Sequence, residues 1–439
     1  MLLHFEVENF LSFKQRQVFS LVASNYYNDH ESALICADVP SLRGLSYLPV
    51  AAMFGPNASG KSNFFKAIEQ LKVLVLNSAV VAPNLPLPYS PFMLDEHTKN
   101  EPTQFAISFT ISGIRYDYEI AYDAGEIVFE ELLTFPKGRK QTVFTRRAQN
   151  LDDGMRLHPQ VEVNQNLKVN PFMISTLREN VLFLSLGAQL NNSKLLEVYT
   201  WFKDEIQLAT TSGLNMDAFF NYSTEVLSGK LGELKRLSFI DKLQKADFGI
   251  DSVRVEYRPM PQEALEALKV VVSDEMYSQV FRDEKSYANV FLKHGNDKNS
   301  VELNINEDSA GIKQFFSLLG PLLDVLDKGL VLIVDEFDAS LHPMLAEFLV
   351  KLFMSSDTNP NSAQLIVATH NMCLLSNTTL RRDQIWFTEK GSDGASHLYP
   401  LSDYRPRKDE SLLTGYFKGR YGALPLFPEH FFDRAGTDS

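Results

Sequence analysis

Residues 55–62 read Gly-Pro-Asn-Ala-Ser-Gly-Lys-Ser, a spacing that suits the binding of phosphate groups. A glycine-rich turn exposes successive backbone N–H groups to an anion, and the start of a following helix directs its dipole toward the same place. In loops of the pattern G-x-x-x-x-G-K-[ST], the lysine reaches the β- and γ-phosphates and the hydroxyl group holds Mg²⁺. The sequence therefore predicts a site for ATP and Mg²⁺. Its candidate nucleotide-binding residues are Gly55, Asn57, Gly60, Lys61, Ser62 and Asn63, of which Ser62 also binds the metal.

The residues on either side of this loop fit the elements that such a loop requires. Residues 48–54 form a short apolar run, as expected for a buried strand, and residues 63–76 carry apolar side chains at helical spacing. A chance glycine-rich turn would need neither element. The pattern therefore favours a strand, a phosphate-binding loop and a helix, in that order.

A second group of candidate residues ends the segment 330–336, an unbroken apolar run that finishes in two acids. Such a run is typical of a central parallel strand buried on both faces, and α/β sheets bind ligands at the carboxyl ends of their strands. We expect Asp335 to hold Mg²⁺ through water and Glu336 to polarise the attacking water as a general base. A plain core strand capped by solvated acids is the alternative for this run taken alone.

A third apolar run, residues 364–371, contains His370 near its end and follows a predicted helix at 345–354. A single histidine at a strand end is more often structural than catalytic. Together, however, the three segments resemble the head of ABC-type ATPases, in which a phosphate-binding loop, an Asp-Glu pair and a strand ending in Thr-His occur in this order. The resemblance implies that His370 contacts the γ-phosphate as a sensor.

Two further segments extend this resemblance. Residues 338–343 are similar to the loop that crosses to the partner subunit in this family, and residues 307–314 resemble a degenerate ABC signature. The resemblance implies that Ser309 and Gly311 contact ATP from the opposite protomer, so that two heads enclose two nucleotides. An ordinary helix start capped by a serine is the alternative for residues 307–314.

The family can be narrowed from four other segments. Residues 8–13 resemble the opening of SMC-like, RecF-like and OLD-like ATPases. Residues 180–185, 245–250 and 419–425 are similar to segments of AAA family ATPases of bacterial anti-phage defence and abortive infection, such as those of Septu, retron and PARIS systems. This resemblance implies regulation of a separate effector, an HNH or TOPRIM nuclease or a toxin. From the residues alone, we expect a packing or turn role for the last three segments.

The composition is that of a globular protein, with 44% hydrophobic and 22% charged residues among 439. The net charge of −13 argues against a broad basic surface for duplex DNA. Local basic clusters are expected to be solvated surfaces, with nucleic acid binding, directly or through a complex, as the alternative. These clusters are residues 137–140 with Arg146 and Arg147, the pair Arg381 and Arg382, and residues 405–408.

Membrane association and secretion are not expected. No run of about eighteen apolar residues occurs, and residues 1–7 fit a strand better than a signal peptide. The two cysteines, Cys36 and Cys373, suit a reducing compartment. The expected location is therefore the cytoplasm.

The expected fold class is α/β: an ABC-ATPase head of the P-loop NTPase type with an antiparallel β meander and a compact helical insertion. Four short strands separated by turn signals between residues 104 and 145 indicate the meander. Helical spacing occurs at 193–209, 229–245 and 263–281, without sustained heptads. The expected domains are an N-terminal lobe at 1–180, the insertion at 181–250 and a C-terminal lobe at 251–439.

These patterns favour an ATP-hydrolysing head that forms a homodimer around ATP and controls a separate effector protein. The candidate catalytic residues are Lys61, Glu336 and His370. Two alternatives stay open. One is a RecF-like clamp on duplex DNA, which would need a basic groove that the composition disfavours, and the other is a scaffold that binds ATP with negligible turnover.

Overall fold

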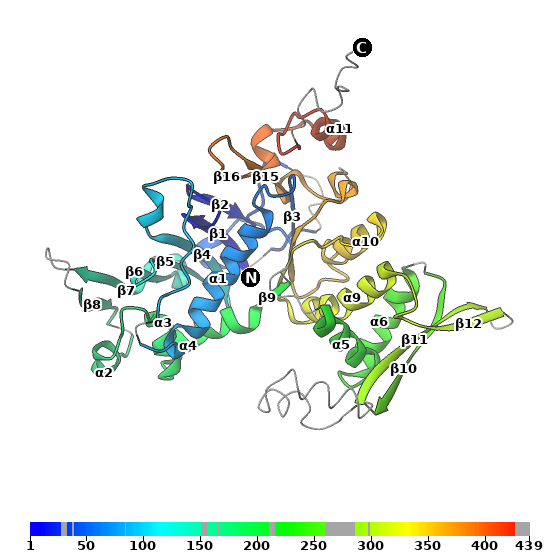
Figure 1. Ribbon diagram of the computed structural model, residues 1–439, viewed down its shortest axis with the longest axis horizontal. Helices are drawn as coiled ribbons and strands as arrows, with labels where there is room; N and C mark the ends of the chain where they lie inside the picture. The colour runs from blue at the N-terminus through cyan, green and yellow to red at the C-terminus, as the bar shows by residue number, and fades with distance from the viewer. Residues whose placement is uncertain are drawn as a thin grey trace, which may run out of the picture. The chain divides into compact units, whose positions relative to one another are not determined.

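The computed structural model covers residues 1–439 and divides into two compact units (Figure 1). The first unit consists of residues 1–213, 326–337 and 350–439, and the second of residues 214–325 and 338–349. These units differ from the lobes expected at 1–180, 181–250 and 251–439, because residues 181–213 belong with the first unit. The structure describes all residues except 28–32, 37–38, 84, 151–155, 166, 210–215, 247, 260–285, 297–298, 377 and 426–439.

A six-stranded sheet in the first unit places the candidate chemistry. Its strand order is β16-β15-β3-β14-β13-β9, and neighbouring strands are parallel except for the antiparallel pair β15 and β16. The central strands are buried along their whole length, as their unbroken apolar sequences predict. The strands are β3 (Val50–Phe54), β9 (Ile206–Ala209), β13 (Val331–Val334), β14 (Gln364–Ala368), β15 (Ile385–Lys390) and β16 (Ser396–Pro400).

A second, seven-stranded sheet of the same unit is entirely antiparallel, in the order β2-β1-β4-β5-β6-β7-β8. The meander expected between residues 104 and 145 is confirmed as β4 to β7, and β1 is an inner strand of the sheet. The strands are β1 (Leu2–Glu8), β2 (Gln17–Ser20), β4 (Thr103–Ile111), β5 (Ile114–Tyr122), β6 (Ile127–Thr134), β7 (Gln141–Asn150) and β8 (Arg156–Val163).

Helix α1 (Lys61–Asn77) shares one apolar core with both sheets. The ring of Phe64 lies 5.5 Å from that of Phe5 on β1 and 5.3 Å from that of Phe19 on β2, measured between ring centroids. The same core includes Met53 of β3 and Ile366 of β14. Because α1 follows the glycine-rich loop directly, packing on both sheets fixes the position of the first turn of the helix beside that loop.

Residues 171–209 follow the seven-stranded sheet along the chain. They form α2 (Pro171–Ser175), α3 (Phe183–Gln189), α4 (Ser193–Thr200), a π-helical turn (Trp201–Glu205) and β9. The expectation of one helix over 193–209 was therefore wrong at its end, since residues 206–209 pair with β13 as an edge strand. The segment 180–185, singled out in the sequence, begins α3. The buried carboxylate of Glu130 accepts the backbone N–H groups of Phe183 and Leu184 at 2.7 and 3.0 Å.

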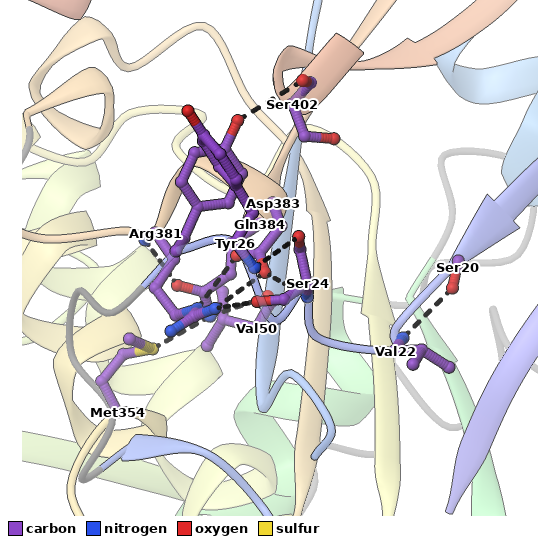
Figure 2. A network of polar contacts seen from close by, with 11 residues as sticks. Ser20, Val22, Ser24, Tyr26, Val50, Met354, Arg381, Asp383, Gln384 and Ser402 are labelled. Carbon is purple, nitrogen blue, oxygen red and sulfur yellow. Dashed lines mark hydrogen bonds and ion pairs between the residues drawn. The ribbon is translucent and has the colours of Figure 1, made fainter. Parts of the chain in front are cut away.

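The pair Arg381 and Arg382 is not a solvated surface, and in the cluster of residues 137–140 with Arg146 and Arg147 only Arg146 is buried. Arg146 is fully buried, and its guanidinium donates to the carbonyl of Glu179 at 2.8 Å. Arg381 is also fully buried and forms a bidentate pair with Asp383, with both N···O distances at 2.9 Å (Figure 2). The expectation of exposed basic clusters was therefore wrong for Arg146 and for the pair Arg381 and Arg382, whereas Lys137, Arg139 and Lys140 are exposed.

The pair Arg381–Asp383 belongs to a network at the start of β15, drawn in Figure 2. The carboxylate of Asp383 accepts the backbone N–H of Ser24 at 2.8 Å. The amide of Gln384 donates to the carbonyl of Val50, the first residue of β3, at 2.9 Å. The network therefore sets how β15 begins beside β3.

The second unit contains helices and a small sheet. Strands β10 (Ile250–Pro259), β11 (Ser286–Asn296) and β12 (Asn299–Asn304) form an antiparallel sheet. The helices are α5 (Met216–Leu227), α6 (Glu233–Lys245) and most of both α9 (Ala310–Lys328) and α10 (Pro343–Phe353). The helix expected at 263–281 lies outside the described residues.

The last described residues, up to 425, pack on β15 of the first unit. They include a short 3₁₀ turn at Leu401–Tyr404 and α11 (Leu412–Phe417), whereas another 3₁₀ turn, Arg382–Gln384, comes directly before β15. Tyr421 is fully buried and stacks on Phe387 of β15, with ring centroids 6.1 Å apart, and the backbone N–H of Ala423 donates to Glu389 at 2.9 Å. The segment 419–425 has the packing role expected for it in the sequence. Within the described part of the chain, no helix is long and apolar enough to cross a membrane.

Candidate nucleotide site

The phosphate-binding loop follows β3 and leads directly into α1. Gly60 is the N-cap of α1 and has no side chain, so no side-chain cap occupies the first amides of the helix within the described residues. The ammonium group of Lys61 folds back over the loop and donates to the carbonyls of Gly55 and Pro56, at 2.8 and 3.1 Å. The loop thus presents a cation and bare amides together, which is a fit for phosphate oxygens.

Two glycines of the loop are required by close contacts in the first unit. A Cβ atom on Gly55 would lie 2.4 Å from the carbonyl oxygen of Thr388 on β15, and one on Gly60 would lie 2.5 Å from the hydroxyl of Ser396 on β16. Both glycines also have positive φ angles, +155° and +119°. The hydroxyls of Ser59 and Thr388 are 2.5 Å apart. The loop is therefore held against the hairpin of β15 and β16.

The two acids stand at the carboxyl end of β13. Asp335 is buried, with 4% of its surface exposed, and its backbone N–H donates to Ala209 at the end of β9. Glu336 is exposed and has a positive φ of 52°, and its backbone N–H donates to the Asp335 carboxylate at 3.1 Å. The left-handed turn separates the two acids into a buried and a solvent-facing position.

The third candidate, His370, follows the carboxyl end of β14. The preceding Thr369 is fully buried, and its backbone N–H donates to Met53 of β3 at 3.1 Å, which fixes the chain just before the histidine. His370 itself is exposed.

One cavity of about 430 Å³ collects these residues at the carboxyl ends of the parallel strands. The candidate residues Asn57, Gly60, Lys61, Ser62, Asn63, Asp335, Glu336 and His370 all line this cavity. The sequence placed them in three separate segments, and the parallel sheet brings the segments together as the carboxyl-end rule requires.

Ser12 and Lys390 line the same cavity and were missed in the sequence. The Ser12 hydroxyl accepts hydrogen bonds from Asn63 and from Ser396, each at 2.8 Å. Lys390 ends β15, which is parallel to β3. No sequence motif marks Lys390, and only the parallel pairing of β15 with β3 places it at the carboxyl edge of the sheet.

Ser309 and Gly311 lie in the second unit and are not among the residues that line this cavity. The Ser309 hydroxyl accepts the backbone N–H of Ile312 at 3.3 Å, so this serine caps α9. A Cβ atom on Gly311 would lie 2.9 Å from the carbonyl oxygen of Ser340, which gives the glycine a packing role within the second unit. The structure thus shows local capping and packing roles for Ser309 and Gly311, and their contact with ATP stays a prediction.

The residues around the cavity suit a Mg²⁺–nucleotide complex. Magnesium binds through one or two protein oxygens, with phosphate and water completing its shell, and Ser62 and Asp335 offer a hydroxyl and a buried carboxylate. Among the described residues, no group of three or more His, Cys, Asp or Glu side chains could hold a metal ion independently of such a ligand.

The parallel sheet, the loop before α1 and the acids after β13 define a P-loop NTPase with the α/β fold of an ABC-ATPase head. The chain belongs to the AAA_21 family, described as "AAA domain, putative AbiEii toxin, Type IV TA system", whose model matches residues 50–168 and 182–376. No curated protein matches the chain.

Two solved structures align along most of the chain at low identity. An SMC head bound to the C-winged helix domain of ScpA has 12% identity and a TM-score of 0.43, covering 91% of this chain and 97% of that chain. The SMC head domain from Thermotoga maritima has 14% identity and a TM-score of 0.41, covering 91% and 98%.

Proposed function

We propose that this chain is an ATPase that binds ATP with Mg²⁺, forms a homodimer around the nucleotide and regulates a separate effector protein. The observation that carries the ATPase part is the single cavity shared by the phosphate-binding loop, Asp335, Glu336 and His370. A purely structural role would not require a buried acid, an exposed acid and a histidine to meet at an uncapped helix start.

Each residue has a distinct part in the proposed reaction. The amides of the loop and the Lys61 ammonium hold the triphosphate, and Ser62 and Asp335 would hold Mg²⁺, which neutralises charge on the phosphates. Glu336, being exposed beside the buried Asp335, accepts a proton from water as it attacks the γ-phosphate in line. His370 contacts the γ-phosphate from the end of the neighbouring strand β14.

ATP binding and turnover by the purified full-length chain test this proposal. We expect Lys61→Ala to weaken ATP binding by at least about tenfold, because a charged hydrogen-bond donor is lost. Glu336→Gln should retain binding and lower kcat by about 100-fold or more. The matched control Glu96→Gln changes an exposed acid that does not line the cavity and should match the wild type.

The results of these binding and turnover assays distinguish an ATPase from a scaffold that only binds the nucleotide. Tight binding without turnover by the wild type would favour a nucleotide-binding scaffold, and unchanged kcat in Glu336→Gln would remove Glu336 as the base. Light scattering should show an ATP-dependent dimer that persists in Glu336→Gln, since this variant keeps the nucleotide intact.

The effector part of the proposal is supported by the family, whose description names a toxin and a type IV TA system. We propose that the effector is a nuclease, of the HNH or TOPRIM class, or a toxin, in an anti-phage defence system of the cytoplasm. Affinity capture of the tagged chain from its host, with and without ATP, followed by mass spectrometry, tests this. A stoichiometric nuclease or toxin is the expected result, whereas capture of DNA alone would favour a clamp on duplex DNA.

A further inference from the structure

A second cavity, of about 520 Å³, adjoins the nucleotide cavity and shares three of its lining residues. The shared residues are Ser12, Asn63 and Lys390. The remaining walls come from Leu11, from residues 89–94 and from Gly394. Because the two cavities share lining residues, a ligand seated on the phosphate-binding loop can continue into the second cavity.

The two cavities differ in the chemistry of their walls. Lys61, Asp335, Glu336 and His370 line only the first cavity, whereas the second has large apolar side chains. Met93 and Leu94 are 60% and 70% exposed, which is costly for apolar side chains unless a ligand or partner covers them. The first cavity thus suits phosphates and the second suits an apolar group.

The loop that carries these apolar residues is fixed in place by hydrogen bonds. The side-chain oxygen of Asn9 accepts the backbone N–H of Phe92 at 2.9 Å, and its amide nitrogen donates to the carbonyl of Thr98 at 2.8 Å. The backbone N–H of Leu11 donates to Ser90 at 2.8 Å. Just beyond Leu94, Lys14 pairs with Asp95 at 2.7 Å and lowers the pKa of that carboxyl to about 2. The loop is therefore organised before any ligand arrives.

Lys390 stands where the two cavities meet. It is exposed at the carboxyl end of β15, and no ion pair involves it among the described residues. A phosphate located between the two cavities would supply the missing counter-charge. The acids and His370 mark the end of the ligand where the γ-phosphate reacts, so the phosphate beside Lys390 and Asn63 is the one nearest the ribose.

We propose that the nucleotide spans both cavities, with its ribose and base in the second cavity and with the ammonium of Lys390 binding the phosphate that joins them. This inference rests on the proposed ATP binding and extends it. Met93 and Leu94 pack against the base, and Lys390 is a nucleotide-binding residue that no phosphate-loop motif contains.

Calorimetric titration of the full-length chain with ATP and with inorganic tripolyphosphate, both with Mg²⁺, tests the proposal. Lys390→Ala should weaken the binding of both ligands by about tenfold, because both carry the phosphate it holds. The double variant Met93→Ala/Leu94→Ala should weaken ATP binding by about fivefold and leave tripolyphosphate binding unchanged. Lys390→Arg should restore most of the affinity for both ligands.

Matched controls remove a lysine or an exposed apolar side chain elsewhere. Lys418→Ala and Phe172→Ala change exposed residues that line neither cavity, and both should bind as the wild type does. The inference is overturned if Lys390→Ala and the double variant keep wild-type affinity for ATP while Lys61→Ala loses it. Absence of ATP binding by the wild type overturns the proposed function as well, so the two failures are distinguishable.

Discussion

At the scale of single residues, Gly60 shows how tightly the phosphate-binding loop is constrained. Its φ of +119° is unfavourable for any residue with a side chain, and the space for a Cβ atom is occupied by Ser396. The hydroxyl of Ser396 also binds Ser12, which in turn binds Asn63 at the start of α1. A methyl group at position 60 would therefore displace the loop and disturb the hydrogen bonds that join Ser396, Ser12 and Asn63.

We expect Gly60→Ala to lower the free energy of unfolding by about 1–3 kcal/mol and to weaken ATP binding by at least about tenfold. Chemical denaturation and calorimetric titration measure the two effects. Gly44→Ala is the matched control, because Gly44 also has a positive φ, +79°, but open space where a Cβ would stand. If both variants bind ATP equally well, the contact with Ser396 does not shape the loop.

At the scale of the element, strand β15 runs from a buried ion pair that stabilises the fold to a residue that lines the nucleotide cavity. Its first residues follow the buried pair Arg381–Asp383, and its last residue is Lys390. Removing one member of a buried, hydrogen-bonded ion pair leaves the other charge without compensation, which costs more than the pair contributes to stability.

Arg381→Ala should therefore lower the free energy of unfolding by about 3–5 kcal/mol, because Asp383 stays buried. Denaturant unfolding followed by circular dichroism measures this loss. Arg407→Ala removes an exposed arginine of the same unit and should change the free energy of unfolding by less than about 0.5 kcal/mol. A loss below about 1 kcal/mol in Arg381→Ala would show that the pair is solvated rather than buried.

Elements with a strong local pattern could be predicted from the sequence. The strands β3, β13 and β14 are continuous apolar runs, and in β4 to β7 buried and more exposed residues alternate between turn signals. The hydrophobic pattern was therefore enough to predict these strands. Strand β9 was missed because its four residues, Ile206–Ala209, continue the apolar spacing of the preceding helix. Only pairing with β13, distant in sequence, selects the extended form.

The candidate site likewise contains some residues that could be predicted from the sequence and others that could not. Lys61, Asp335 and Glu336 carry their chemistry in short motifs, so their meeting in one cavity could be predicted. Lys390 and Ser12 could not, since a single lysine or serine has no distinctive spacing. The burial of Arg146 and Arg381 was also invisible, because partners such as Glu179 and Ser24 come from other parts of the chain.

At the scale of the whole molecule, the proposed dimer makes a prediction about mixtures. If Ser309 acts on the nucleotide held by its partner, a variant without Lys61 and a variant without a functional Ser309 are each inactive alone. A mixed dimer would contain one site with an intact Lys61 and an intact Ser309. Complementation can therefore reveal a site shared between subunits.

We expect Lys61→Ala and Ser309→Arg to have negligible ATPase activity separately and to recover up to about a quarter of wild-type activity when mixed in equal amounts. That fraction follows because about half of the dimers formed are mixed, each with one of two sites intact. A steady-state ATPase assay measures the recovery. Mixing Lys61→Ala with Glu336→Gln is the control: both residues line the cavity of one subunit, so each site of the mixed dimer lacks one of them and no recovery is expected. Full activity of Ser309→Arg alone would remove Ser309 from the site, and two inactive variants that show no recovery when mixed would contradict a site shared between subunits.

The order of strands in the six-stranded sheet has a consequence for biosynthesis. The strand β3, which leads into the phosphate-binding loop, lies between β14 and β15, and both of these emerge from the ribosome long after it. Until then the nascent chain carries a loop and an apolar strand with neither neighbour in place. A polypeptide released before residue 385 would lack both β15 and β16, the whole of that edge of the sheet. The phosphate-binding loop therefore acquires both strands that flank β3 only after the chain has been made through β15.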